Sequence, residues 1–306
     1  MIRRRLSREV LPVRSVPRPK TPKGSLGRAK PTVRSMSSHS LVFGLPEEWN
    51  VFLKTHKEFL DRQASLVALL DRTFTREISV QRPADGVVFF MGRLCVEDFM
   101  EILLMCGNGY GIGAMKLLRA MYEQAVTMGY LAKHPEEADM FLNYSKIHAY
   151  KRLGHLQNEE RAQFFSQSQI DDIRTNYESV KEIYTEMICK KCRKKRVQAS
   201  WSKLDLLTMA REAELDGLYH SCYFEPTLQM HATDSSLIWR FEKREDGELG
   251  FDASAQRQWA STVLMLAHSL MIHVLLIQNK YFNLSIDEDL ESRFQDFKEI
   301  WGKTPE

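Results

Sequence analysis

The chain has 306 residues, of which 43% are hydrophobic, and this composition is typical of a globular protein with one core domain. Residues 1–40 carry 11 of the 43 basic residues and one of the 40 acidic ones, so this segment has a net charge of +10 and the remainder −7. Five scattered cysteines exclude a disulfide framework, so we expect a protein of the reducing cytoplasm.

Residues 1–40 are rich in Arg, Pro and Ser and show no apolar period, which predicts a disordered basic tail. Such a tail could contact nucleic acid or a membrane surface. It could also be an extension without a role, or translation could start at Met36. No aromatic residue lies among the basic ones to stack on bases. Nucleic acid is therefore a possible partner through the tail alone, and other partners are unknown.

Residues 41–306 are expected to form a single all-α domain, an irregular bundle of seven to nine helices with at most one small hairpin. The 3.6-residue apolar period persists through the chain, and long alternating runs are absent. The expected long helices cover residues 46–76, 87–106, 111–132, 135–156, 159–191, 200–214, 254–282 and 287–301. We also expect a short helical stretch that is broken at Pro226. The expected hairpin lies within residues 238–251.

The most apolar segment, residues 263–277, is too short to span a bilayer. It has 15 residues and contains His268 and His273, whereas a spanning helix needs about 20 apolar residues. We expect a buried core helix here and no transmembrane segment. The N-terminus also lacks the apolar stretch of a signal peptide.

The segment 111–132 is predicted to be the central helix, because it is apolar on most of its faces. Within it, Arg119 and Glu123 lie four residues apart on one face. A charge in a buried helix is costly unless it is paired and hydrogen-bonded. Two interpretations remain open: an internal ion pair that fixes helix register, or a polar pocket between helices.

Tyr130, His148 and His231 join Arg119 and Glu123 as the candidate polar site. Glu and His side chains can transfer protons, and Arg can bind an anion. These five residues meet only if the helices that carry them pack together. The sequence predicts no cofactor and no metal: Cys189 and Cys192 form one Cys-x-x-Cys pair without a second pair, in a basic turn.

Several short motifs resemble an uncharacterised bacterial family of all-helical proteins, a "domain of unknown function" family. The motifs are Leu-Leu-Arg-x-x-x-Glu ending at Glu123, then Tyr130-Leu131-Ala132, Pro135-Glu136-Glu137-Ala138, Trp201-Ser202, Tyr219, Tyr223 and His231. The resemblance covers roughly residues 90–280 and implies a helical fold and a polar site. It implies no activity.

The sequence contains no Gly-x-Ser-x-Gly, His-Glu-x-x-His or dinucleotide-binding motif. We therefore favour a cytoplasmic helical module whose Arg/Glu/His site binds a ligand or partner, with oligomer formation possible. The alternative is a metal-independent ribonuclease, as in helical toxin and defence proteins. Within residues 41–306, the expected helical domain, the Arg-to-His spacing of four to six residues that is typical of those enzymes is absent.

Overall fold

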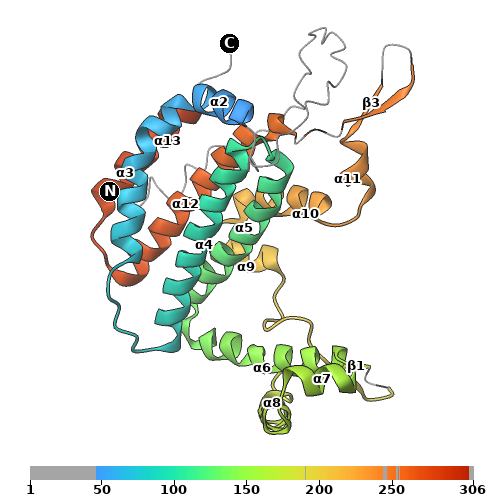
Figure 1. The fold of residues 1–306 in the computed structure, drawn as a ribbon. Coiled ribbons are helices and arrows are strands. Elements are labelled where there is room, and N and C mark those ends of the chain that lie inside the picture. Colours follow the sequence, from blue (N-terminus) through green and yellow to red (C-terminus); the bar gives the residue numbers. More distant parts are fainter. Residues whose placement is uncertain (1–45, 190, 244–246, 253, 255, 303–306) are drawn as a thin grey trace. The chain divides into compact units, whose positions relative to one another are not determined.

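A computed structural model describes residues 46–189, 191–243, 247–252, 254 and 256–302 (Figure 1). It confirms the all-α class. Eight helices in this part of the chain have at least ten residues, and with four shorter α-helices the total exceeds the expected seven to nine. The eight longer helices are α2 (Pro46–Thr55), α3 (Lys57–Phe74), α4 (Pro83–Gly107), α5 (Gly111–Lys133), α6 (Ala138–His155), α8 (Gln167–Val180), α12 (Ala260–Phe282) and α13 (Asp287–Trp301). The predicted disordered tail, residues 1–40, lies outside the described residues.

The chain divides into two compact units. The first contains residues 1–76, 91–125 and 214–306, and the second contains residues 77–90 and 126–213. The long helices α4 and α5 contribute to both. A single domain over residues 41–306 stays a prediction.

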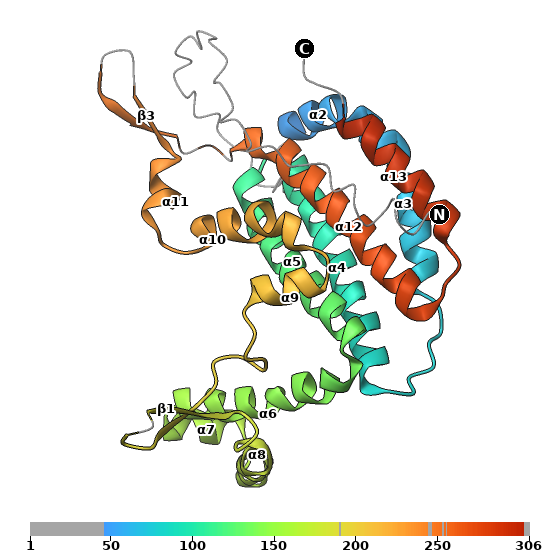
Figure 2. The same ribbon diagram turned by 180° about the vertical axis from the view of Figure 1, so that it is seen from behind.

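In the first unit, α3, α12 and α13 lie side by side (Figure 2). Helix α12 is the core element expected from its apolar sequence, and most of its side chains are buried. The predicted helix 46–76 is two helices, because the chain bends at His56 between α2 and α3. Trp301 of α13 donates a hydrogen bond from Nε1 to Nδ1 of His268 at 3.1 Å, which ties α13 to α12.

Helix α12 is also the only described helix that is long and apolar enough to cross a membrane, counted with its leading turn from residue 257 to 282. Within its most apolar 18 residues, 61% are buried in the protein. That burial is typical of a helix in a protein core and agrees with the expected core helix.

Glycines shape the turn between α4 and α5. Gly109 has a φ of +75°, a conformation that costs a residue with a Cβ atom about 1–2 kcal/mol. A Cβ atom on Gly111 would lie 2.4 Å from the backbone oxygen of Gln256, so only glycine fits where α5 begins. The turn therefore positions the central helix close to the backbone that leads into α12.

The second unit is built on α6 and α8, which pack together, with the short helix α7 (Asn158–Phe164) before α8. A capping box separates α7 from α8: Ser166 Oγ accepts from the Gln169 N–H at 3.3 Å, and Gln169 Oε1 accepts from the Ser166 N–H at 2.8 Å. The side chain of Tyr184 is fully buried and donates from its hydroxyl to the Met140 carbonyl at 2.6 Å.

The prediction of a helix up to residue 191 is wrong, and so is that of at most one hairpin. Strands β1 (Thr185–Cys189) and β2 (Lys194–Val197) pair antiparallel after α8 ends at Val180. Ile183 and Tyr184 continue the apolar spacing of α8, which is why the sequence predicts a longer helix. The second hairpin, β3 (Phe241–Lys243) with β4 (Leu249–Phe251), confirms the expected one.

The remaining described elements are short. They are the helices η1 (Pro135–Glu137), α9 (Leu206–Glu212), η2 (Asp216–Leu218), η3 (His220–Phe224), α10 (Glu225–Met230), α11 (Asp234–Ile238) and η4 (Arg257–Trp259). Helix α9 begins later than predicted, because its cap is Asp205 and not the Ser-Trp-Ser segment: Asp205 Oδ1 accepts from the Thr208 N–H at 2.7 Å. Helix α12 also begins later, since Gln256 has a left-handed backbone conformation.

Candidate functional site

Arg119 and Glu123 form an ion pair on α5, within the first unit. Nη2 of Arg119 lies 2.6 Å from Oε1 of Glu123. The Arg119 side chain is 16% exposed and that of Glu123 is 38% exposed. The pair is therefore half-buried, whereas the sequence led us to expect two buried groups.

Three further contacts hold the Arg119 guanidinium in one position. Its Nε donates a hydrogen bond to the hydroxyl of Thr227 at 2.9 Å. Its plane lies over the ring of Tyr223, with Cζ 4.8 Å from the ring centroid. Its Nη1 lies 3.2 Å from the sulfur of Met230, which is a weak acceptor. Arg119 thus binds a segment more than 100 residues further along the chain.

That segment has an unusual backbone. Residues His220–Phe224 form one turn of π-helix, and α10 follows directly. The predicted break at Pro226 is wrong, since this proline lies in the first turn of α10, where its missing N–H leaves no bond unmade. Thr227 donates from its hydroxyl to the Tyr223 carbonyl at 2.6 Å. Single π-turns within helices often occur at functional sites.

Aromatic side chains of α5 and the π-turn pack beneath this contact. Tyr122 is fully buried and donates from its hydroxyl to the Leu215 carbonyl at 2.9 Å. Its ring centroid lies 6.4 Å from those of Tyr219 and Tyr223. Ring packing therefore holds the π-turn against α5 and places Tyr223 under the guanidinium, while the hydrogen bond attaches Leu215, which precedes the π-turn, to the same helix.

Glu123 is the less satisfied partner of the ion pair. Burial raises the pKa of Glu123, and the Arg119 charge opposes that shift. Its Oε1 is buried, and although Arg119 is close, the geometry gives this oxygen no hydrogen bond within the described part of the chain. The ion pair therefore compensates the charge of this oxygen without satisfying the hydrogen-bond geometry.

A second half-buried carboxyl lies nearby, between α4 and α5. Burial first, and then the charges of Glu101 and Glu97, raise the pKa of Asp98 to about 6. The side chain of Gln124, which follows Glu123 in α5, forms a hydrogen bond with Asp98, and this hydrogen bond opposes the rise in pKa. Oδ2 of Asp98 and Oε1 of Gln124 are buried without a hydrogen-bond partner among the described residues. Neither residue is among those predicted from the sequence. The signal that could have indicated Asp98 is the group of acidic residues Glu97, Asp98 and Glu101 within the otherwise apolar helix α4.

The other three candidate residues are not brought to Arg119 by any contact of the described residues in the first unit. His231, at the end of α10, is exposed and makes no hydrogen bond or ion pair to Arg119 or Glu123. Tyr130 and His148 belong to the second unit. Tyr130 is buried and donates to Glu137 Oε1 at 2.8 Å. His148 is exposed and lies edge-on to Tyr144, with ring centroids 4.7 Å apart.

Cys189 and Cys192 lie at the tip of the β1–β2 hairpin, and both thiols are free. The Cys192 backbone N–H donates to Cys189 Sγ at 3.4 Å. This hydrogen bond, with further donors from Cys192 and Lys191, lowers the pKa of Cys189. The two thiols supply two of the four ligands of a structural zinc site.

Comparisons with known proteins identify one relationship. The model of a family described as a family of unknown function, DUF5677, matches residues 85–249, which is more than half of the chain. The match confirms the resemblance to a domain of unknown function. No curated protein and no solved structure matches the chain.

Proposed function

Because the chain belongs to the DUF5677 family, whose function is unknown, we propose a function from its own site. We infer that the protein is a ligand- or partner-binding module, with Arg119 and Glu123 as the recognition pair. The observation that supports this most is the fixed position of Arg119, which three contacts outside the ion pair hold beside the half-exposed Glu123 carboxylate.

The Arg119 guanidinium also has N–H donors without an acceptor among the described residues. An Arg side chain carries five N–H groups. Arg119 directs one at Thr227 and one at the Met230 sulfur, and its Nη2 lies against Glu123 in the ion pair, so at least two N–H groups have no acceptor within the described residues. A fixed pair of this kind offers N–H donors and a carboxylate acceptor side by side.

These groups suit a ligand that has a carboxylate or carbonyl oxygen next to an N–H group. The oxygen would accept from Arg119, and the N–H would donate to the accessible part of the Glu123 carboxylate, whose side chain is 38% exposed. Amino acids, and peptide segments with a free carboxylate, have this arrangement. Met230 is 46% exposed and Tyr223 is partly exposed, so apolar surface is available beside the polar groups.

No observation favours the ribonuclease alternative. Such an enzyme needs a general acid–base group beside the Arg. His231 is exposed and makes no hydrogen bond to the pair in the described residues. Ribonuclease activity therefore stays a prediction from the sequence and is not proposed further.

We also propose that the protein works in the cytoplasm, where its five free thiols stay reduced.

The test is a thermal-shift screen with amino acids and short peptides on wild type, Arg119→Gln and Arg93→Gln. Arg93 is a matched control, because it pairs with Glu97 at the same spacing on the exposed face of α4. A ligand at ten times its Kd stabilises by about 1.4 kcal/mol, or roughly 3 °C at this size.

We expect this shift in wild type and Arg93→Gln and its loss in Arg119→Gln. An equal shift in all three proteins, or none in any, would contradict the proposal. If Arg119→Gln is too unstable to assay, Arg119→Lys keeps the charge but not the planar fork, and a weaker shift is expected.

A further inference from the structure

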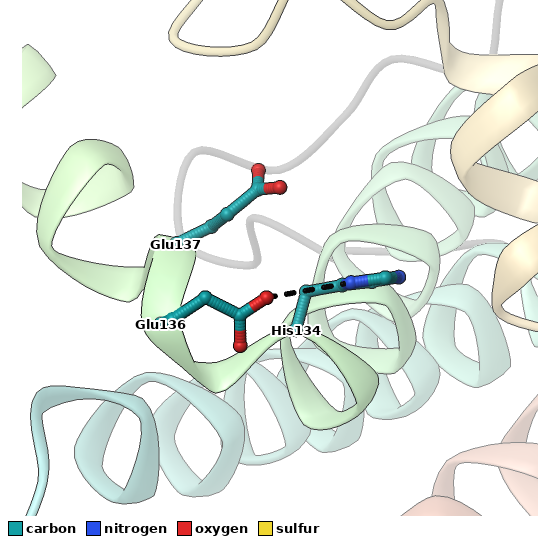
Figure 3. A group of neighbouring side chains, drawn as sticks. All are labelled: His134, Glu136 and Glu137. Atoms are coloured by element: carbon teal, nitrogen blue, oxygen red, sulfur yellow. Dashed lines mark ion pairs between the residues drawn. The ribbon is translucent and has the colours of Figure 1, made fainter.

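A second polar cluster lies in the second unit, where α5 ends and η1 begins. His134, Glu136 and Glu137 each offer one ligand atom, and these atoms all lie within 4.8 Å of one another (Figure 3). His134 follows the last residue of α5, and Pro135 turns the chain so that both glutamates lie near the imidazole. Three side chains from four consecutive residues therefore converge.

The separation of the atoms is informative. Nδ1 of His134 lies 3.6 Å from Oε1 of Glu136. This is too long for a direct hydrogen bond, which spans about 2.7–3.2 Å. Two ligands that bind one ion at about 2.0–2.1 Å in a tetrahedral site lie about 3.3 Å apart. Glu136 is 70% exposed, so its carboxylate can make the small remaining movement.

The other ring nitrogen supplies an independent observation. Nε2 of His134 is buried and has no hydrogen-bond partner in the described residues. The nearest carboxylate oxygen in an ion pair with it is Oε2 of Glu212, at the end of α9, 3.8 Å away. A histidine that binds a metal through one nitrogen almost always donates its other N–H to a carboxylate or carbonyl. Glu212 is placed to become that acceptor.

Tyr130 fixes the cluster from the buried side. Its hydroxyl donates to Glu137 Oε1 at 2.8 Å, and its ring stacks on the His134 imidazole at 4.5 Å with 28° between planes. Burial, together with the hydrogen bond to Glu137 and the charges of Glu136 and Glu212, raises the pKa of Tyr130. One phenol therefore lies near all three carboxylates and orients one of them.

A simpler interpretation explains only part of this arrangement. Acidic residues in the first turn of a helix stabilise it by interacting with the helix dipole. This accounts for Glu136 and Glu137 at the start of η1 and α6. It does not account for Glu212, which comes from α9, or for the buried Nε2 of His134.

We propose that His134 Nδ1, Glu136 and Glu137 bind a divalent first-row transition-metal ion, with Glu212 as the acceptor for His134 Nε2–H. One imidazole with carboxylates favours Zn²⁺ or a similar ion over Mg²⁺ and Ca²⁺, which prefer oxygen ligands alone. Such an ion would offset the repulsion among three carboxylates. It would also clamp the junction of α5 and α6 to the end of α9.

The test is calorimetric titration of the full chain with Zn²⁺ and, separately, Mg²⁺. Cys189→Ser and Cys192→Ser are included throughout so that the hairpin thiols do not compete. We expect one Zn²⁺ per chain and at least tenfold weaker binding of Mg²⁺. His134→Gln, Glu136→Gln and Glu137→Gln should each weaken Zn²⁺ binding more than tenfold, and Glu212→Gln by about tenfold.

His155→Gln is the matched control, since His155 is an exposed histidine at the end of α6 and should leave binding unchanged. The exposed side chain of Glu136 makes Glu136→Gln safe for folding, so it decides the test even if His134→Gln does not fold. Equal Zn²⁺ affinity in all variants, or no binding of Zn²⁺ to the parent chain, would overturn the proposal.

Discussion

The first unit contains two Arg–Glu pairs with the same order and the same four-residue spacing along a helix. In the described part of the chain, only one of them has contacts with side chains outside its own helix. In α4, Nε of Arg93 lies 3.6 Å from Oε1 of Glu97, and the two side chains are 46% and 57% exposed. In α5, Nη2 of Arg119 lies 2.6 Å from Oε1 of Glu123, and the two side chains are 16% and 38% exposed. Arg119 of the second pair also contacts Thr227, Tyr223 and Met230 of the π-turn and α10.

This difference shows that helical spacing does not determine what an ion pair does. An exposed pair of this kind stabilises a helix by at most about 0.5 kcal/mol. A pair that is partly withdrawn from water depends on its other contacts for its stability, and removing one partner becomes expensive. Four variants, from the largest expected effect to the smallest, test this distinction.

Removal of the Arg119 charge should have the largest effect. Arg119→Met loses the hydrogen bond to Thr227 and leaves Glu123 without its countercharge. Because the pair is only half-buried, we expect a loss of about 2–3 kcal/mol of unfolding free energy, below the full cost of breaking a buried pair. Arg93→Met should cost less than about 0.5 kcal/mol. Urea denaturation of both variants measures this, and equal losses would erase the distinction.

Removal of the Thr227 hydroxyl should have the second-largest effect on stability. Thr227→Val keeps the shape of the side chain but removes the acceptor for Arg119 Nε and the donor to the Tyr223 carbonyl. We expect a loss of about 1–2 kcal/mol. In a double-mutant cycle with Arg119→Met, the two losses should overlap by at least about 0.5 kcal/mol, because the residues share a contact. Strict additivity would show that the hydrogen bond contributes nothing.

Asp98, which follows Glu97 of the exposed pair, predicts a pH dependence. Its folded pKa of about 6 lies above the ordinary value of 3.8, so ionisation of Asp98 destabilises the folded state. Its contribution to stability is therefore greatest at low pH and is lost as the pH rises through about 6.

Asp98→Asn should then stabilise the protein at pH 8 by about 1 kcal/mol, a value reduced from the full shift because the carboxyl is half-exposed. The gain should fade between about pH 6 and 4. Thermal melts across this range check it, with Asp71→Asn at an exposed position of α3 as the control. A gain that does not change with pH would contradict the assignment.

Deletion of residues 1–40 should have the smallest effect. The sequence of this segment cannot bury enough apolar surface to contribute to a core. The melting temperature should stay nearly unchanged, well within about 5 °C, and both ion pairs should keep their response to mutation. A larger drop would show that the segment packs against the body.

Sequence and structure agree best where a long helix has one continuous apolar surface. Helix α12 follows from its apolar residues alone, and the start of α5 agrees with the prediction to the residue. The region after α8 differs from its prediction. Tyr184 keeps the helical spacing of that helix, yet its burial and its hydrogen bond to Met140 belong to a turn into a hairpin. Local spacing cannot distinguish these two structures.

The sequence by itself determined the helical class and the choice of Arg119 and Glu123, because two charges in an apolar helix are visible without coordinates. Only the tertiary structure decided which groups surround them. Thr227 lies 108 residues from Arg119, and Glu212 lies 78 from His134. Such contacts depend on how separate elements pack and on where a π-turn directs its side chains, and no spacing along the chain records either.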